Sequence, residues 1–217
     1  MQIDFSSVIT LLHSCPSGVL ATHSRQIEGY PYATTLPFVL DELHRPVFLV
    51  SALAEHTKNL MSDQRCSLLL SEPSGQQVLK GARITIVGDA ERFAATESLI
   101  NHYLRYQPDA KQYLDLGDFL FFRLIPKRAH YIAGFGQMGW SEGMEWENVQ
   151  PLSLDQDAHL CHAMMAHLPK GIRLLGIDCF GFDAERDGKR ERFQFANAPI
   201  AEGNLEDVIR RFLKGLV

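Results

Sequence analysis

One short stretch of the sequence gathers the side chains best suited to hold a phosphate group. An apolar run over 46–52 leads into a segment with helical spacing over 55–62. The polar side chains of this stretch are Ser51, His56, Thr57, Lys58 and Asn59. Free backbone N–H groups and the positive end of the helix dipole favour an anion at a helix start. The stretch therefore predicts an anion site, with the simpler alternative that Thr57 only caps the helix.

A second stretch, 30–38, has the pattern of a strand that carries hydroxyl groups. Alternation along a strand places Thr34 on one face and Thr35 on the other. Pro37 lacks an N–H and fits poorly inside a sheet. Such a strand could expose backbone groups to a flat heterocycle, but a strand with an ordinary polar face explains the pattern equally well.

The elements around these stretches indicate a closed sheet with short helices at its edge. After a helix over 3–13, strands are predicted over 18–22, 30–40, 46–52, 66–71, 83–93, 119–124 and 129–135. Short helices are predicted over 55–62, 96–106 and 108–113. Gly88 inside a strand is typical of a bulge. Many strands with few helices favour a barrel, because closure removes exposed strand edges.

The remainder of the chain predicts a small α+β lobe behind the barrel. Residues 136–154 mix glycine, tryptophan and acidic residues and are expected to form a loop. A helix over 155–167, a hairpin that turns at Asp187-Gly188 and a helix over 205–216 follow. We therefore predict a barrel domain over 1–140, a linker over 141–154 and a C-terminal lobe over 155–217.

Composition narrows the class of protein. The 217 residues are 46% hydrophobic and 22% charged, as in ordinary globular proteins. A net charge of -5 disfavours broad binding to nucleic acid or anionic lipid. The four cysteines form no CxxC pair, and no apolar run approaches the roughly 18 residues that span a bilayer. The expectation is a soluble cytoplasmic protein without a nucleic-acid or membrane partner.

Three motifs in order resemble one known family. They are Gly18-Val-Leu-Ala-Thr22, the segment from Tyr30 to Phe38, and the segment from Ser51 to Leu60 with its His-Thr-Lys-Asn core. They resemble the haem-iron-utilisation branch of the pyridoxamine 5'-phosphate oxidase-like, FMN-binding split-barrel proteins. The resemblance covers roughly residues 5–140, and the tail is similar to the small domain often fused behind this barrel. It implies an α+β fold, namely a split β-barrel with peripheral helices and a C-terminal α+β lobe.

The resemblance also implies a flavin-dependent oxidoreductase, a homodimer with FMN at the subunit interface. The residues implied to bind FMN are Thr34, Thr35, Phe38, Ser51, His56, Thr57, Lys58, Asn59 and Arg83. The first three would line the isoalloxazine edge and the others the phosphate end. For Arg83 a surface ion pair is an equally good explanation. The segment Gly134-Phe-Gly136 with Trp140 could pack on the flavin.

Two other functions stay open at this stage. The first is a haem-binding or haem-degrading protein of iron utilisation, whose axial ligand would be one of His13, His23, His44, His130, His159, His162 and His167. The second is a carrier of flavin or another small ligand without turnover. Histidine spacing does not indicate a metal site, because His159 and His162 share a helix face without an acidic partner.

Overall fold

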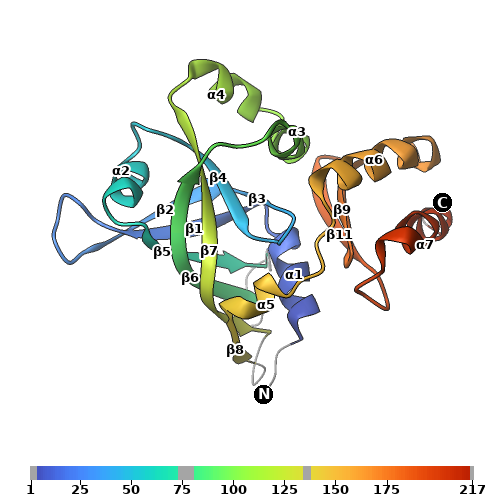
Figure 1. The fold of residues 1–217 in the computed structure, drawn as a ribbon, viewed down its shortest axis with the longest axis horizontal. Coiled ribbons are helices and arrows are strands. Elements are labelled where there is room, and N and C mark those ends of the chain that lie inside the picture. The colour runs from blue at the N-terminus through green and yellow to red at the C-terminus, as the bar shows by residue number, and fades with distance from the viewer. Residues whose placement is uncertain (1–3, 73–80, 134–137, 216–217) are drawn as a thin grey trace.

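The computed structural model describes residues 4–72, 81–133 and 138–215. Figure 1 shows two parts: β1 to β8 curl into a barrel, and β9 to β11 with α6 and α7 form a smaller lobe beside it. The α+β class and the split barrel expected from the sequence are confirmed. Among the described residues, no helix is both long enough and apolar enough to cross a membrane.

The barrel is one antiparallel sheet whose two edges are joined by the chain itself. Its strands are β1 (Ser17–His23), β2 (Pro31–Pro37), β3 (Val39–Leu40), β4 (Pro46–Ser51), β5 (Arg65–Ser71), β6 (Arg83–Phe93), β7 (Phe119–Ile132) and β8 (Met138–Glu142). The order across the sheet is β2-β1-β5-β6-β7-β4-β3, and β8 pairs with β7. Only Phe38 separates the two outermost strands, β2 and β3, so the chain passes directly from one edge to the other.

The predicted bulge at Gly88 is confirmed. The register between β6 and β7 shifts between Val87 and Gly88. A Cβ atom at Gly88 would lie 2.1 Å from the carbonyl oxygen of Ile125, so the two backbones approach closely only because this residue is glycine. A bulge of this kind bends the strand and helps the sheet to close.

The barrel core comes from alternating side chains that meet across strands. Leu20 pairs with Leu68 and Leu68 with Ile86, and all three are completely buried. Strand β4 is buried on both faces, as its apolar run predicts. Phe48 belongs to the barrel core, whereas Val47 packs in a second cluster beneath α3. This explains why the run shows no alternation.

Five helices accompany the barrel strands. They are α1 (Phe5–Ser14), α2 (Glu55–Ser62), α3 (Glu97–Tyr106), α4 (Ala110–Leu116) and α5 (Gly143–Glu147). Helix α1 begins at Asp4, whose carboxylate accepts a hydrogen bond from the N–H of Ser6 at 3.1 Å. Helix α1 contributes to both parts of the molecule: Leu12 is buried in the barrel core and Ile9 in the core of the lobe.

The C-terminal lobe is a three-stranded sheet covered by helices. It comprises α6 (Leu154–Met164), a 3-10 turn (Met165–His167), β9 (Ile172–Asp178), β10 (Gly181–Arg186), β11 (Lys189–Gln194) and α7 (Glu202–Lys214), with the sheet order β11-β10-β9. The predicted hairpin turn is confirmed, because Asp187 and Gly188 both have positive φ.

Buried Asp157 of α6 ties the lobe to the barrel. Its carboxylate accepts hydrogen bonds from His102 Nδ1 of α3 at 2.9 Å and from the N–H of Ile177 at 2.7 Å. It also pairs with the guanidinium of Arg105. A buried carboxylate with several donors from different elements holds those elements in one arrangement.

Three predictions about the elements are wrong. The strand expected over 30–40 is divided at Phe38 into β2 and β3, which lie at opposite edges of the sheet. Residues 119–124 and 129–135 do not form two paired strands, because β7 runs without a break from Phe119 to Ile132 and pairs with β6 along its length. The segment 136–154, expected to be a loop, contains β8 and α5. Trp146 of α5 anchors this segment to the barrel, because it is buried and donates a hydrogen bond to the His44 carbonyl at 3.3 Å. The Gly134–Gly136 segment lies outside the described residues, and the proposed domain boundaries stay a prediction.

Candidate functional site

Helix α2 begins without a side-chain cap. The residue before its first turn is Ala54, which has no side-chain oxygen to accept the free N–H groups. Thr57 lies inside the helix, and its own N–H is bonded to the Ala54 carbonyl at 3.1 Å. The alternative that Thr57 serves as the cap is therefore wrong. The helix start keeps backbone donors that no side chain of the cap position satisfies.

Three consecutive side chains at this helix start have buried polar atoms without a hydrogen-bond partner among the described residues. These atoms are Glu55 Oε1, His56 Nε2 and Thr57 Oγ1. Thr57 is 1% exposed. Burial lowers the pKa of His56, which favours the neutral imidazole. Buried polar atoms without partners are rare in folded proteins, so this group indicates a place where a ligand supplies the partners.

Two other residues expected to hold the phosphate are already engaged within the chain. The Ser51 hydroxyl donates to Asp118 Oδ2 at 2.9 Å and accepts from the N–H of Leu53 at 3.1 Å. Buried Asn59 donates to Thr22 Oγ1 at 3.0 Å, and its Oδ1 accepts from the N–H of Arg25 at 3.0 Å. Asn59 thereby positions α2 against the end of β1, whereas Ser51 contacts the residue before β7. Lys58, on the same helix, is half-buried.

The residues expected around the isoalloxazine edge are spread over different surfaces. Thr34 lies on the face of β2 that also carries Leu36, whereas Thr35 points outward and is exposed. Phe38 is 1% exposed and belongs to the barrel core, so its side chain is not available to a ligand. Of these three residues, Thr34 and Thr35 remain accessible.

Arg83 lies far along the sheet from α2 within one chain. It pairs with Ser71 at one end of β5, while Thr22, which Asn59 of α2 contacts, pairs with Cys66 near the other end. Arg83 is half-buried and engaged in an interaction within the chain. The structure therefore does not bring Arg83 together with the residues of α2 in a single copy.

The outward side chains of β1, β5, β6, β7 and β8 form a surface that we name the barrel face. Val19, Leu69, Thr85, His130 and Trp140 lie in register across these five strands. Three of them are apolar and exposed, by 37% at Val19, 40% at Leu69 and 51% at Trp140.

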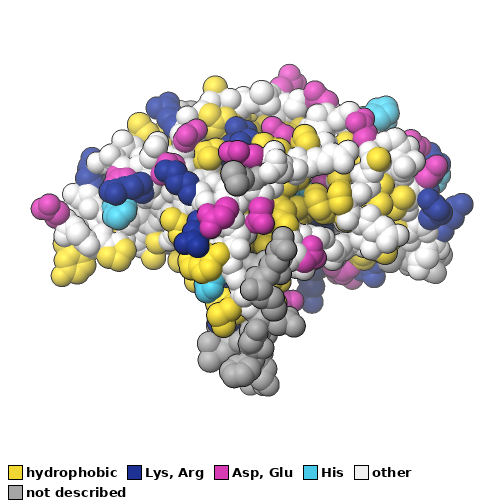
Figure 2. Space-filling model, turned by 60° about the horizontal axis from the view of Figure 1, so that its bottom comes forward, with side chains coloured by type: hydrophobic (Ala, Val, Ile, Leu, Met, Phe, Trp, Pro, Cys, Tyr) yellow, Lys and Arg dark blue, Asp and Glu magenta, His cyan; other side chains and the backbone are white. Residues whose placement is uncertain are grey.

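A hollow of about 440 Å³ opens beside this row, between apolar and charged side chains. Its lining includes His23, Val87, Arg65, Lys127 and Asp89. Arg65 is paired with Asp63, and Lys127 with Asp89. Figure 2 shows that hydrophobic side chains reach the molecular surface in several patches, with basic and acidic side chains between them.

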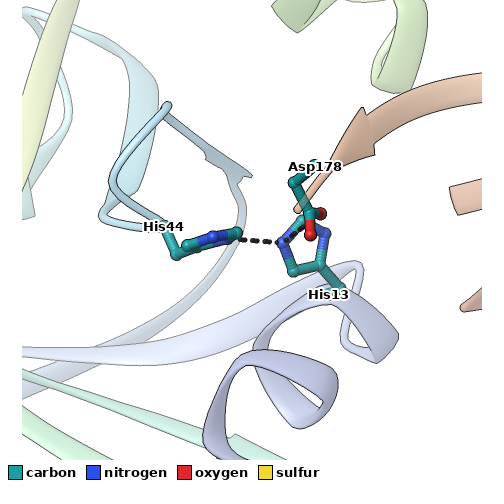
Figure 3. Close-up of side chains that lie close together, drawn as sticks. All are labelled: His13, His44 and Asp178. Atoms are coloured by element: carbon teal, nitrogen blue, oxygen red, sulfur yellow. Dashed lines mark hydrogen bonds and ion pairs between the residues drawn. The ribbon is translucent and has the colours of Figure 1, made fainter. Parts of the chain in front are cut away.

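A further group of polar side chains joins the barrel to the lobe, and the sequence carries no spacing that would reveal it. His13 of α1, His44 between β3 and β4, and Asp178 at the end of β9 point toward one another (Figure 3). His13 and His44 are buried, at 7% and 2% exposure. These residues lie far apart in the chain, so only the packing of the lobe brings them together.

Comparison with known proteins agrees with the fold. Residues 8–148 match the family model described as "CREG, beta-barrel". The chain is 32% identical over 164 residues to the chloroplast haem oxygenase HOZ of Arabidopsis thaliana. That match covers 74% of this chain and 50% of HOZ, so the chain spans about half the length of that relative.

Solved structures resemble the whole chain. A haem-binding protein of Mycobacterium smegmatis is 26% identical with a TM-score of 0.62, covering 99% of each chain. A protein of unknown function from Agrobacterium tumefaciens has a TM-score of 0.75 at 22% identity, covers 99% of this chain and 95% of its own, and shows the fold alone. The chain belongs to the CREG β-barrel family, and its relatives are consistent with the haem-utilisation branch of the pyridoxamine 5'-phosphate oxidase-like split-barrel proteins.

Proposed function

We propose that this protein binds haem on the barrel face and takes part in its oxidative breakdown. Two relatives support haem as the ligand, since one is named a haem oxygenase and the other a haem-binding protein. The observation that carries the proposal is the hollow of about 440 Å³ on the barrel face, which combines an exposed imidazole, apolar strand side chains and cationic side chains.

The chemistry of this surface suits an amphipathic, dianionic macrocycle. The apolar part of haem would lie against the outward side chains of β1, β5 and β6, such as Val19 and Val87. Arg65 and Lys127 at the hollow, which pair with Asp63 and Asp89 in the ligand-free chain, would exchange these partners for the propionate groups. A histidine imidazole is a usual axial donor to haem iron, and His23 presents an exposed one at the hollow.

The structure narrows the choice of axial histidine. His13 and His44 are buried and hydrogen-bonded to each other, and His167 Nε2 is bonded to Arg210. His159 lines a hollow with Asp155, Glu202 and Glu206, whose carboxylates would repel propionates. His130 is stacked on the Trp140 ring, with ring centroids 4.5 Å apart.

Two exposed histidines remain, His23 on the barrel face and His162 on α6. His162 also lines a hollow, of about 530 Å³, in the lobe. We favour His23 because a second copy of the chain could cover the barrel face and shield the iron from water.

A haem titration of the purified protein tests this proposal. We expect a Soret shift that saturates at one haem per chain and is lost or strongly weakened in His23→Ala. The matched control is His162→Ala, which removes an equally exposed imidazole and should leave the spectrum unchanged. Loss of binding in the control alone would move the site to the lobe, and no Soret shift in any variant would refute haem binding. Breakdown would appear as decay of the Soret band with ascorbate and oxygen.

FMN is a second candidate ligand, and the start of α2 favours it. A ribityl phosphate offers hydroxyl donors for Glu55 Oε1 and phosphate oxygens for the helix N–H groups and for Thr57 Oγ1. Haem propionates accept hydrogen bonds only and would leave the Glu55 oxygen unpaired. FMN would supply the redox chemistry itself, while Thr57, Lys58 and Thr34 would hold and orient it.

Absorbance and fluorescence decide the FMN proposal. Protein incubated with FMN and desalted should keep a yellow chromophore with altered fluorescence, and NAD(P)H should then bleach it if the protein is an oxidoreductase. Retained flavin without any reduction would support a carrier. A colourless protein after desalting would refute FMN binding.

The exposed row on the barrel face supports a homodimer. Val19, Leu69 and Trp140 place apolar area in register on a surface that water covers in one copy. A second copy laid on the barrel face would bury this row and enclose either ligand. Light scattering should report twice the chain mass of 24.5 kDa. Leu69→Lys should lower that mass, and a monomeric wild-type protein at micromolar concentration would refute the dimer.

A further inference from the structure

The polar group between barrel and lobe has the geometry of a metal site. One nitrogen of His13, one nitrogen of His44 and one oxygen of Asp178 lie within 4.8 Å of one another. His13 Nε2 is 2.8 Å from His44 Nδ1 and 3.5 Å from Asp178 Oδ2 (Figure 3). Ligand atoms about 2.0–2.1 Å from a tetrahedral Zn²⁺ are about 3.3 Å apart from one another. The two separations from His13 bracket this value, and the ligand atoms of His44 and Asp178 lie within 4.8 Å of each other.

The partners of these side chains hold them in a ligating orientation. His13 Nδ1 lies 2.6 Å from Asp183 Oδ2, which leaves Nε2 facing the group. The same oxygen of Asp183 accepts from the Tyr106 hydroxyl at 2.6 Å. Metal-binding histidines in proteins commonly use their second nitrogen in this way, on a carboxylate that fixes tautomer and orientation.

Arg192 orients the Asp178 carboxylate but does not neutralise the whole group. Its guanidinium lies 2.7 Å and 2.9 Å from the two oxygens of Asp178. Burial opposes ionisation of Asp178 and Asp183, but Arg192 and His13 outweigh it and hold the pKa of both carboxyls below the usual range. Two buried carboxylates therefore face one guanidinium.

The His44 ring is buried, at 2% exposure, and its Nδ1 faces His13 Nε2. A cavity of about 20 Å³ borders His13, His44 and Asp178. A cavity of this size holds one water molecule, which could complete a four-coordinate site.

We propose that His13, His44 and Asp178 bind a divalent transition-metal ion of the Zn²⁺ type, with water as the fourth ligand. The three ligands come from α1, from the turn between β3 and β4, and from β9. The ion would cross-link two barrel segments to the lobe and stabilise their docking. The alternative is that the three side chains contact only one another and the neighbouring residues, with no ion between them.

Titration of the untagged full-length chain with Co²⁺ and Zn²⁺ distinguishes a bound metal ion from a group of side chains without one. After treatment with a chelator, Co²⁺ should bind at one ion per chain and give the intense visible bands of a tetrahedral N/O site. Zn²⁺ should abolish those bands by competition and raise the Tm in proportion to the logarithm of its concentration. His44→Gln should remove the bands, whereas His162→Gln, which changes an exposed histidine of α6, should not.

Several outcomes would overturn the metal proposal. If Co²⁺ gives no visible bands and Zn²⁺ leaves the Tm unchanged, the group binds no metal ion and the proposal is refuted. A thiolate-to-cobalt charge-transfer band would place the ion on cysteine instead. If His44→Gln fails to fold, X-ray absorption of the Zn²⁺-loaded wild-type protein tests the proposal. The spectrum must then show two imidazole ligands, and the remaining ligands must all be oxygen atoms. These readouts do not depend on haem or FMN binding.

Discussion

Replacing Thr57 with valine should stabilise the ligand-free protein but weaken ligand binding. The Thr57 hydroxyl is buried without a hydrogen-bond partner among the described residues, and valine keeps the side-chain shape. Burying an unpaired hydroxyl costs about 1–3 kcal/mol. Thr57→Val should therefore raise the free energy of unfolding of the ligand-free protein by about 1 kcal/mol. For a chain of this size, that corresponds to a rise in Tm of about 2–4 °C.

The same substitution should weaken FMN binding. A hydrogen bond to a charged phosphate contributes about 1.5–3 kcal/mol, which corresponds to a loss in affinity of about tenfold to a hundredfold. Urea unfolding measures the first effect and fluorescence titration with FMN the second.

Thr22→Val is the matched control for Thr57→Val. Thr22 is also buried, but its hydroxyl accepts from Asn59 Nδ2 at 3.0 Å. Its loss leaves the Asn59 amide short of a partner and should destabilise the protein by about 1–2 kcal/mol. If Thr57→Val destabilised the protein as Thr22→Val does, the hydroxyl would have a structural partner. That result would refute the reasoning that assigns the start of α2 to a ligand.

Three further predictions concern the architecture. Asp157→Asn should lower the free energy of unfolding, measured in urea, by about 2–4 kcal/mol, because the half-buried guanidinium of Arg105 loses its counter-charge. A decrease of less than about 1 kcal/mol would mean that water replaces the carboxylate as the partner of Arg105. Gly88→Ala should lower the Tm strongly, since its Cβ would lie 2.1 Å from a carbonyl oxygen, whereas Gly203→Ala, with open space in α7, should raise stability by about 0.5–1 kcal/mol. Burial raises the pKa of Cys15 to about 11. A thiol reagent at pH 8 should therefore label Cys15 slowly until urea is added. The free energy of unfolding should fall as the pH rises above about 9, the pKa of the thiol in the unfolded chain. Rapid labelling of the native protein would contradict this burial.

Local patterns were sufficient for most of the barrel. The apolar run 46–52 predicts a strand without a solvent face, and β4 is indeed covered by the barrel core on one side and by α3 on the other. Gly88 predicts the bulge, and Asp187-Gly188 predicts the hairpin turn. These features depend on neighbours within a few residues, so the sequence carries them directly.

The predicted site shows the limit of such patterns. The stretch from Ser51 to Asn59 correctly marks an uncapped helix start with polar side chains. Which of those side chains remain available depends on residues far away in the chain. Asp118 accepts the hydrogen bond of the Ser51 hydroxyl, and Thr22 accepts that of the Asn59 amide. Sequence spacing cannot show that these two hydroxyl and amide groups are already used.

The amino-acid sequence alone determined the class of fold, the place of most of its strands along the chain and the place of the helix start, because periodicity and turn chemistry act over short distances. Tertiary structure alone decided that Phe38 is enclosed in the core, that Arg83 lies away from α2, and that His13, His44 and Asp178 meet. The physical reason is that side chains from distant segments become neighbours only when the sheet closes and the lobe docks on α1.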